Sequence, residues 1–156
     1  MTAEAKKWIG FEKTTVSDIV TKRLIREYTL ATGDDDPLFL DPEYAATTRY
    51  GGLIAPPLFH SAATRRVVPE SRLLPDGQYD DLAVPGISGR SMAGSREIEF
   101  FNPVRPGDIV TEKMRITDIY EKSGRSGNLV FQISEVTFTN QRGELLAVEK
   151  HTLIFR

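Results

Sequence analysis

Apolar residues recur at helical spacing in one early stretch of the chain. Between residues 22 and 32, one face of a helix would carry the apolar side chains of Leu24, Ile25, Tyr28 and Ala31. The Thr21 hydroxyl can accept a hydrogen bond from a free backbone amide of the first turn. Gly33 suits the position that follows a helix C-terminus. This pattern predicts a helix over residues 22–32.

Two further helix starts follow along the chain. Asp41 followed by Pro42 is a good start signal, because aspartate caps a helix and proline fits its first position. A longer helix is predicted from about Pro57 to Val67, with a mostly apolar face formed by Leu58, Phe59, Ala62 and Ala63. Residues 69–95 are rich in Pro, Gly, Ser and Asp, so we expect a long irregular connection there.

The C-terminal part of the chain has a different pattern, typical of strands. Many Ile, Val, Thr, Phe and Tyr residues occur in Arg96–Phe101, Ile109–Lys122, Ser126–Asn140 and Glu144–Phe155, and polar and apolar positions alternate in the third of these segments. Turn residues separate these segments. The alternation slips phase between Ile133 and Val136, as a β-bulge would cause. Helices first and strands later favour a single α+β domain over residues 1–156, with helices on one face of an antiparallel sheet.

Composition narrows the classes of function. The 156 residues are 40% hydrophobic and 27% charged, as in ordinary globular proteins, and the net charge of −2 does not favour nucleic acid or an anionic membrane as partner. No apolar run approaches the length of about 18 residues that a membrane span needs. Cysteine is absent, which excludes disulfides and thiolate metal sites. The N-terminus leads into no hydrophobic secretion segment, so the cytoplasm is the expected location.

Carboxylates are concentrated at one turn. Asp34, Asp35 and Asp36 precede Pro37, an arrangement typical of a solvated turn. Asp36 is expected to bind local backbone, whereas Asp34 fits a site role as well as a turn role. The three carboxylates could suggest a metal, but no histidine is adjacent and loops that bind hard cations have another spacing. No metal is expected.

Four short motifs, in this order and spacing, resemble one known family. They are Ala31-Thr32-Gly33-Asp34-Asp35-Asp36-Pro37, Asp41-Pro42-Glu43-Tyr44-Ala45, Gly51-Gly52-Leu53-Ile54-Ala55-Pro56-Pro57 and Pro103-Val104-Arg105-Pro106-Gly107-Asp108. The chain resembles the MaoC-like group of (R)-specific enoyl-CoA hydratases and dehydratases, above all their N-terminal-type dehydratase domain. The resemblance implies the α+β hot-dog fold, in which a long antiparallel β-sheet wraps around a central helix.

The chain differs from the family at two positions on which the family's reaction depends. Adding water to an enoyl thioester needs an acid–base pair and hydrogen-bond donors for the thioester oxygen. In the family an aspartate and a histidine five residues later hold the water, and an amide at the start of the central helix binds the oxygen. On this chain the aspartate is Asp34, the histidine position is Phe39, and the glycine that donates its amide falls at Pro57. Phenylalanine cannot transfer a proton, and proline has no backbone N–H.

Candidate site residues follow from the motifs and the resemblance. Asp34 and His60 are the catalytic candidates, His60 as a substitute for the missing histidine or as a packed structural residue. An acyl groove would be lined by Phe39, Pro57, Leu58, Phe59 and Ala62, although Phe39 and Phe59 also fit a core. The other histidine, His151, fits a sheet surface. Guanidinium groups that could meet coenzyme A phosphates belong to Arg65, Arg66, Arg90 and Arg96.

Three functions remain open from the sequence. The first is a hydratase or dehydratase component in fatty acid metabolism, active only with a catalytically complete partner. The second is a self-sufficient hydratase or thioesterase that uses Asp34 or His60. The third is a non-catalytic module that binds acyl-CoA. The resemblance implies no cofactor beyond the coenzyme A thioester as substrate or ligand. It also implies a homodimer, or a heterodimer with a MaoC-like hydratase subunit, formed by edge-to-edge sheet pairing.

Overall fold

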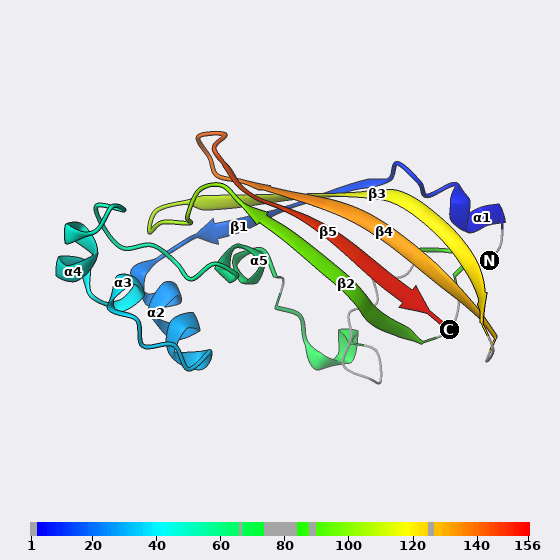
Figure 1. The fold of residues 1–156 in the computed structure, drawn as a ribbon, viewed down its shortest axis with the longest axis horizontal. Helices are drawn as coiled ribbons and strands as arrows, with labels where there is room; N and C mark the ends of the chain where they lie inside the picture. Colours follow the sequence, from blue (N-terminus) through cyan, green and yellow to red (C-terminus); the bar gives the residue numbers. More distant parts are fainter. Residues whose placement is uncertain (1–2, 66, 74–83, 88–89, 125–126) are drawn as a thin grey trace.

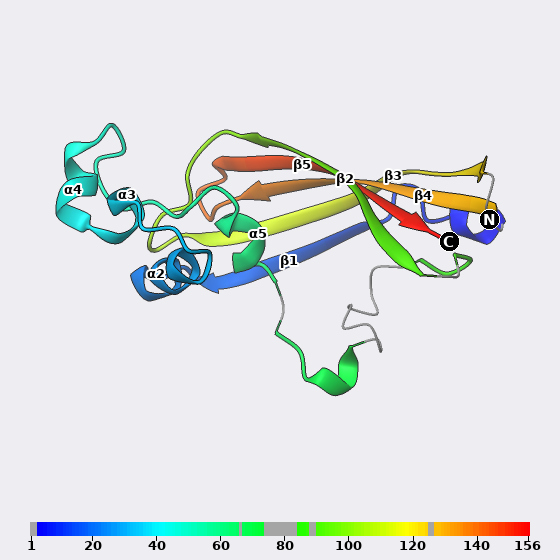
Figure 2. The same cartoon turned by 60° about the horizontal axis from the view of Figure 1, so that its bottom comes forward.

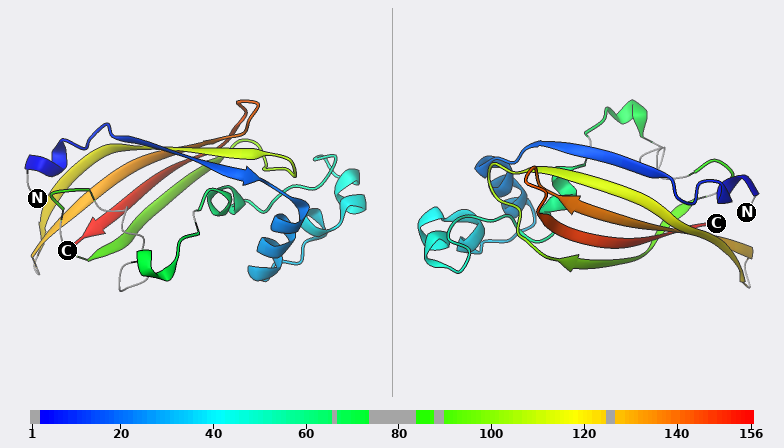
Figure 3. Two further views of the ribbon diagram at one scale, coloured as in Figure 1. Left: turned by 180° about the vertical axis from the view of Figure 1, so that it is seen from behind. Right: turned by 90° about the horizontal axis from the view of Figure 1, so that it is seen from above.

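A five-stranded antiparallel sheet forms the body of the protein. The structure is a computed structural model that describes residues 3–65, 67–73, 84–87, 90–124 and 127–156. The strands are β1 (Glu12–Ile19), β2 (Ser91–Phe100), β3 (Ile109–Gly124), β4 (Gly127–Thr139) and β5 (Leu145–Phe155). Their order in the sheet is β1-β3-β4-β5-β2, visible in the right-hand view of Figure 3. The antiparallel α+β prediction is confirmed, and three of the predicted strands match β3, β4 and β5 closely.

Helices gather beyond one end of the sheet and under its curve. They are α1 (Ala3–Lys6), α2 (Lys22–Ala31), α3 (Pro37–Leu40), α4 (Pro42–Thr47), α5 (Phe59–Ala63) and the 3₁₀ turn η1 (Glu70–Arg72). Helices α2, α3 and α4 lie at one end of the sheet, and the two termini lie at the other (Figure 1). Helix α5 lies beneath the sheet (Figures 2 and 3). No helix in the described ranges is long and apolar enough to cross a membrane.

Local signals explain where α2 begins and ends. The Thr21 side chain accepts a hydrogen bond from the Leu24 amide at 3.1 Å, which caps the helix as predicted. After the helix, Gly33 adopts φ +73°, a left-handed conformation that favours glycine. The Asp34 amide then donates to the Thr29 carbonyl at 3.1 Å. The chain is thereby turned toward α3 and α4.

Two predicted element bounds are wrong. The helix expected from about Pro57 to Val67 spans only Phe59–Ala63. The prolines delay its start, and the helix ends where the Thr64 amide donates to the Ala62 carbonyl. The irregular connection expected over residues 69–95 ends earlier, since β2 already begins at Ser91; its residues 74–83 and 88–89 lie outside the described part of the chain.

Strand β1 was not predicted, and its sequence explains why. Its residues are mostly polar, and it lies at an edge of the sheet, so period-two alternation is weak. Its place comes from pairing with β3, where Glu12 faces Arg115 and Val16 faces Thr111. Non-local pairing of this kind leaves little trace in a local pattern.

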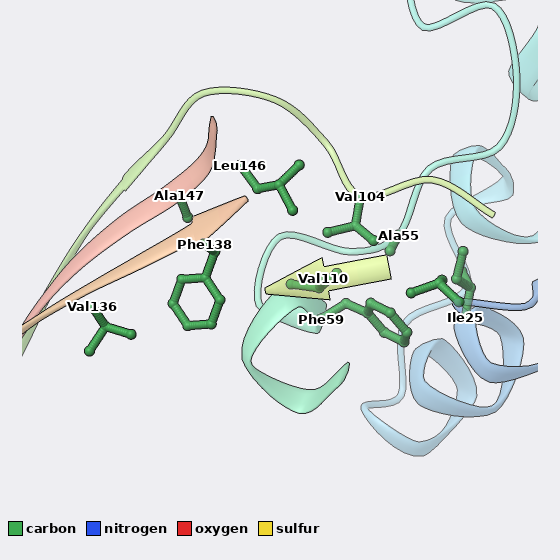
Figure 4. Close-up of a cluster of buried hydrophobic side chains, with 10 residues drawn as sticks. Ile25, Ala55, Phe59, Val104, Val110, Val136, Phe138, Leu146 and Ala147 are labelled. Atoms are coloured by element: carbon green, nitrogen blue, oxygen red, sulfur yellow. The ribbon is translucent and has the colours of Figure 1, made fainter. Parts of the chain in front are cut away.

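The hydrophobic core has two clusters. The first lies under the sheet around α5 and contains Val20, Ile25, Ala55, Phe59, Val104, Val110, Val136, Phe138, Leu146 and Ala147 (Figure 4). The second contains Ala5, Val84, Ile116, Ile119, Val130 and Phe155. In the first cluster the Phe59 ring meets the Tyr28 ring edge to face, with centroids 5.4 Å apart. This contact fixes α5 against α2, and so fixes the segment that carries Pro57 and His60.

Candidate functional site

A pocket of about 500 Å³ opens where α3, the segment before α5 and the end of β2 meet. Its lining is mostly apolar and consists of Leu38, Phe39, Arg49, Tyr50, Ile54, Ala55, Pro56, Pro57, His60, Phe100, Phe101, Asn102, Pro103, Val104 and Leu146. Backbone hydrogen bonds hold these segments together: the Ala55 amide donates to the Val104 carbonyl at 2.8 Å, and the Phe101 amide to the Leu146 carbonyl at 2.9 Å. A mostly apolar pocket with few polar groups is typical of a small-molecule site.

Phe39 forms part of the pocket through a short, well-capped helix. The Asp36 side chain accepts from the Leu38 amide at 2.8 Å, and Pro37 occupies the first turn of α3. The Phe39 side chain is 9% exposed and lines the pocket. It presents only carbon to the pocket at the position where the family resemblance expects a histidine.

Pro57 lines the pocket just before α5, where the family resemblance expects a backbone hydrogen-bond donor. It has no N–H to donate to a ligand. Its carbonyl oxygen instead lies 2.7 Å from Nδ1 of His60. The pocket wall therefore offers no amide hydrogen at this residue.

His60 is buried among charged and aromatic groups. Its side chain is 2% exposed and also lines the pocket. Nε2 lies 2.7 Å from Oε1 of Glu149, while Nδ1 faces the Pro57 carbonyl. The ring meets those of Phe138 and Phe100 edge to face, at centroid distances of 4.5 and 5.7 Å. Both ring nitrogens thus face oxygen atoms of the protein.

Glu149 is a fully buried carboxylate on β5. Its Oε1 accepts from His60 and from Nη2 of Arg96 at 2.5 Å, and its Oε2 accepts from Nε of Arg96 at 3.1 Å and from Nε2 of His151 at 2.5 Å. Burial alone raises the pKa of Glu149, but the hydrogen bonds from His151, His60 and Arg96 outweigh burial and hold that pKa well below its usual range. Glu149 is therefore ionised.

Glu149, Arg96 and His151 form a hydrogen-bonded network that the sequence analysis did not predict. Glu149 occupies an inward position of β5, in phase with Ala147 and Phe155, where a carboxylate is unusual. A carboxylate at an inward-facing strand position could have marked Glu149 as a functional candidate, but the sequence analysis did not single it out. Arg96, considered for coenzyme A phosphates, is engaged with Glu149 instead. His151 is half-buried and bonded to Glu149, so it is more than the plain surface residue that was expected.

The carboxylates of the Asp-rich turn act locally in the structure. Asp34 is half-buried, accepts from the Asp36 amide at 3.0 Å, and is not among the residues that line the pocket. Asp41 caps α4 by accepting from the amides of Glu43 and Tyr44 at 2.8 and 3.2 Å. Among the described residues, no group of three or more His, Asp or Glu side chains could hold a metal ion.

The remaining predicted groove residues lie around α5. Leu58 is 45% exposed, Phe59 belongs to the first core cluster, and Ala62 is half-buried on the helix. These three do not line the pocket, whereas Phe39 and Pro57 do. Of the other arginines, Arg66 lies outside the described residues.

Tyr50 and Arg49 supply the polar part of the lining that sequence reasoning did not single out. Arg49 donates from Nη2 to the Tyr50 hydroxyl at 2.7 Å and lies over the Tyr50 ring, 4.8 Å from its centroid. Arg105 donates to the Tyr50 carbonyl at 2.8 Å. These contacts hold a guanidinium group at one part of an otherwise apolar lining.

Comparison with known families gives one match over most of the chain. Residues 7–149 match the family described as "FAS1-like, dehydratase domain region". A UPF0336 protein from Thermobifida fusca is 32% identical over 108 residues, covering 67% of this chain and 64% of its own length. A "Probable enoyl-CoA hydratase alpha subunit" from Thermomonospora curvata is 29% identical over 156 residues, covering 94% of this chain and 49% of its own length. The chain thus spans less than two thirds of the length of each of these two relatives.

Solved structures show the same fold at low identity. The ChsH1-ChsH2 complex from Mycobacterium tuberculosis matches with a TM-score of 0.75 at 20% identity, covering 93% of this chain and 84% of that chain. The C-terminally truncated HadBC (3R-hydroxyacyl-ACP dehydratase) complex from the same organism gives 0.70 at 24%, covering 96% and 98%. The MaoC-like dehydratase from Rhodospirillum rubrum gives 0.67 at 21%, covering 94% and 91%. The hot-dog fold expected from the motifs is confirmed.

Proposed function

The chain belongs to the family of FAS1-like dehydratase domain regions, and from this premise we propose that it is the acyl-binding, non-catalytic component of a two-subunit hydratase or dehydratase. Its ligand would be an enoyl or hydroxyacyl thioester, and a catalytically complete MaoC-like subunit would supply the missing chemistry. The proposal concerns the pocket beside α5 and the residues that line it.

One observation carries the proposal: the pocket is formed, but its lining has carbon at Phe39, where the family resemblance expects a histidine, and no amide N–H at Pro57. Hydration joins the water oxygen to Cβ of the thioester and a proton to Cα, while negative charge gathers on the thioester oxygen. Phe39 can neither take the proton from water nor return one to Cα. Pro57 cannot donate to the thioester oxygen. The partner would therefore supply the acid–base pair and the oxygen-binding donors.

His60 is a poor substitute for the missing histidine. A general base needs a nitrogen lone pair, and an acid must reach the reacting carbon. Both ring nitrogens of His60 are already engaged, one with Pro57 and one with Glu149. This geometry argues against the self-sufficient enzyme and leaves His60 a role in shaping the pocket.

The relatives support a partner. One relative is named as an alpha subunit, and two of the similar structures are complexes of two named proteins. Strand β2 lies at an edge of the sheet, and within the described residues no further strand pairs with it. An edge strand with free backbone groups can pair with another chain. We propose that this edge pairs with a second hot-dog subunit, or with a second copy in its absence.

Calorimetric titration with crotonyl-CoA and longer acyl-CoAs tests whether the pocket binds the acyl group. Ala55→Leu fills the pocket, whereas Ala62→Leu adds the same atoms to α5 outside the lining. We expect Ala55→Leu to weaken binding at least about tenfold and Ala62→Leu to leave it unchanged. Overpacking costs about 1–3 kcal/mol, so circular dichroism must first show both variants folded.

Two outcomes would overturn this assignment of the pocket. The first is equal weakening by the two variants. The second is no binding of any acyl-CoA to the wild type, either alone or with a partner subunit. A non-catalytic module that works alone would bind in the same way, but it would give no turnover with any catalytic partner. Reconstitution separates that alternative from the proposed one.

A further inference from the structure

His60 lies between two hydrogen-bond acceptors. A carbonyl oxygen such as that of Pro57 can only accept, and an ionised carboxylate such as that of Glu149 can only accept. A neutral imidazole carries one N–H and one lone pair, so it can satisfy only one of these two partners. At 2.7 Å to each oxygen, both Nδ1 and Nε2 must carry hydrogen. The contacts therefore require a doubly protonated ring.

The ion pair with Arg96 and the lowered pKa of Glu149 argue against the alternative assignment, a protonated carboxyl that donates to His60. An ionised carboxylate has about four acceptor sites. All four are used here, by His60, by His151 and by the two-pronged contact from Arg96. A proton on Oε1 of Glu149 would be donated to His60 and would keep the contacts with His151 and Arg96, but it would leave the Arg96 guanidinium without an ionised partner.

We propose that His60 is a positioning residue, held as an imidazolium, that links the Pro57 side of the acyl pocket to Glu149 and makes ligand binding depend on its proton. The identity of the ligand rests on the proposed function, but the protonation state and the link do not. His60, Pro57 and Phe100 all line the pocket. The ring also packs against Phe100, so a shift of His60 moves two neighbouring parts of the wall.

Loss of one proton would leave a nitrogen lone pair facing an oxygen. The ring is 2% exposed, so water cannot readily take the place of the lost donor. If Nδ1 loses hydrogen, the Pro57 carbonyl is repelled; if Nε2 loses hydrogen, Glu149 is repelled. Either change shifts the wall of the pocket, and binding weakens as the pH rises.

The charged groups nearest His60 come from two strands, β5 and β2, and a further carboxylate of β3 contacts the end of α5. They are Glu149 and His151 on β5, Arg96 on β2 and Glu112 on β3; Glu112 accepts from the Thr64 hydroxyl at the end of α5 at 2.5 Å. His151 bonds Glu149 through one nitrogen only, so its neutral form satisfies that contact. It does not line the pocket, and it is therefore the matched control for His60.

Nitrogen-15 NMR of the intact chain, without any ligand, tests the protonation state. The expected spectrum at about pH 7 has both His60 nitrogens protonated, and His60→Gln assigns the signals. In the same samples, the methyl signals of Ile54 and Leu146, which line the pocket, should shift together with the loss of the His60 proton as the pH rises. A neutral His60 at that pH would overturn the inference even if acyl-CoA binds well. Methyl signals of Ile54 and Leu146 that stay unchanged when His60 loses its proton would do the same.

Crotonyl-CoA binding from about pH 7 to about pH 9.5 then tests the functional consequence. Wild type and His151→Gln should lose roughly 5- to 100-fold in affinity over this range, the scale expected when a buried polar group loses its partner. The affinity of His60→Gln for crotonyl-CoA should not change over this pH range. If this variant folds poorly, Glu149→Gln serves as a second variant with the same expected result. A slope that persists in His60→Gln, or that disappears in His151→Gln, contradicts the role given to His60. Absence of binding at every pH would overturn the proposed function and leave the NMR result standing.

Discussion

At the residue scale, the proposed function rests on three residues of the pocket lining: Phe39, Pro57 and His60. Phe39 has no group that transfers a proton and Pro57 has no N–H, while His60 has both nitrogens engaged with protein oxygens. The network behind them centres on Glu149, which is 0% exposed and accepts from three side chains. Its carboxylate is the most constrained charge near the pocket.

Removing that carboxylate should be costly. Glu149→Ala leaves Arg96 and His60 without their partner, and breaking a buried ion pair in this way typically costs about 3–5 kcal/mol. Glu149→Gln should cost less, because an amide can still bond these neighbours. Urea unfolding followed by the fluorescence of Trp8, the one tryptophan of the chain, measures both. Equal stability of Glu149→Ala and wild type would show that the network does not stabilise the fold.

The pH dependence of stability has a definite sign. The pKa of Glu149 is lower in the folded chain than in the unfolded one, so its contribution is fully present above about pH 4.3 and is lost as the pH falls toward the folded-state pKa. Between neutral pH and about pH 3, wild type should therefore lose stability more steeply than Glu149→Gln. The same urea series at several pH values provides the measurement.

At the element scale, helix caps position the segment that leads into the pocket. Asp41 accepts from two amides of α4, whereas Asp35 is exposed and has no hydrogen bond among the described contacts. Asp41→Ala should lower the free energy of unfolding by about 1 kcal/mol, the usual value of an N-cap. Asp35→Ala removes the same charge and should stay within about 0.5 kcal/mol of wild type. If the two variants are equally destabilised, net charge rather than capping is responsible.

Elements with a local signal could be predicted, and elements with a non-local cause could not. Helix α2 has its Thr21 cap, its apolar face and Gly33, and β3 to β5 are rich in β-branched and aromatic residues and are separated by turn residues. Strand β1 owes its place to pairing with β3, and α5 is short because neighbouring prolines and Thr64 limit it. The predicted helix continues past Ala63 because the spacing of apolar side chains does not show where the prolines and Thr64 limit it.

The same distinction holds for the site. The motifs placed Phe39 and Pro57 beside a pocket, because their neighbours form a recognisable order along the chain. The link from His60 to Glu149 joins residues far apart in sequence through sheet register, with Glu149 facing Ile98 on β2 and Val136 on β4. No local pattern specifies which inward position of β5 lies next to α5, so the charged network became visible only in the fold.

At the scale of the whole molecule, the chain has the hot-dog fold and a mostly apolar pocket whose lining includes Phe39 and Pro57. The family match spans residues 7–149, and two of the similar structures are complexes of two proteins. Loss of one oxygen-binding donor typically costs about 100- to 1000-fold in rate, and loss of an acid–base group costs roughly 100- to 10,000-fold. Either loss alone would be enough to hide hydration by the chain in a routine assay.

The most direct measurement of this claim is the steady-state hydration of crotonyl-CoA and longer enoyl-CoAs by the purified wild-type chain. The assay is run with the chain alone and after reconstitution with a catalytically complete MaoC-like subunit that co-purifies from the native host. The account predicts no turnover above background for the chain alone. With the partner, it predicts turnover that falls when Ala55→Leu fills the pocket and is kept in Ala62→Leu. Robust turnover by the wild-type chain alone would contradict it.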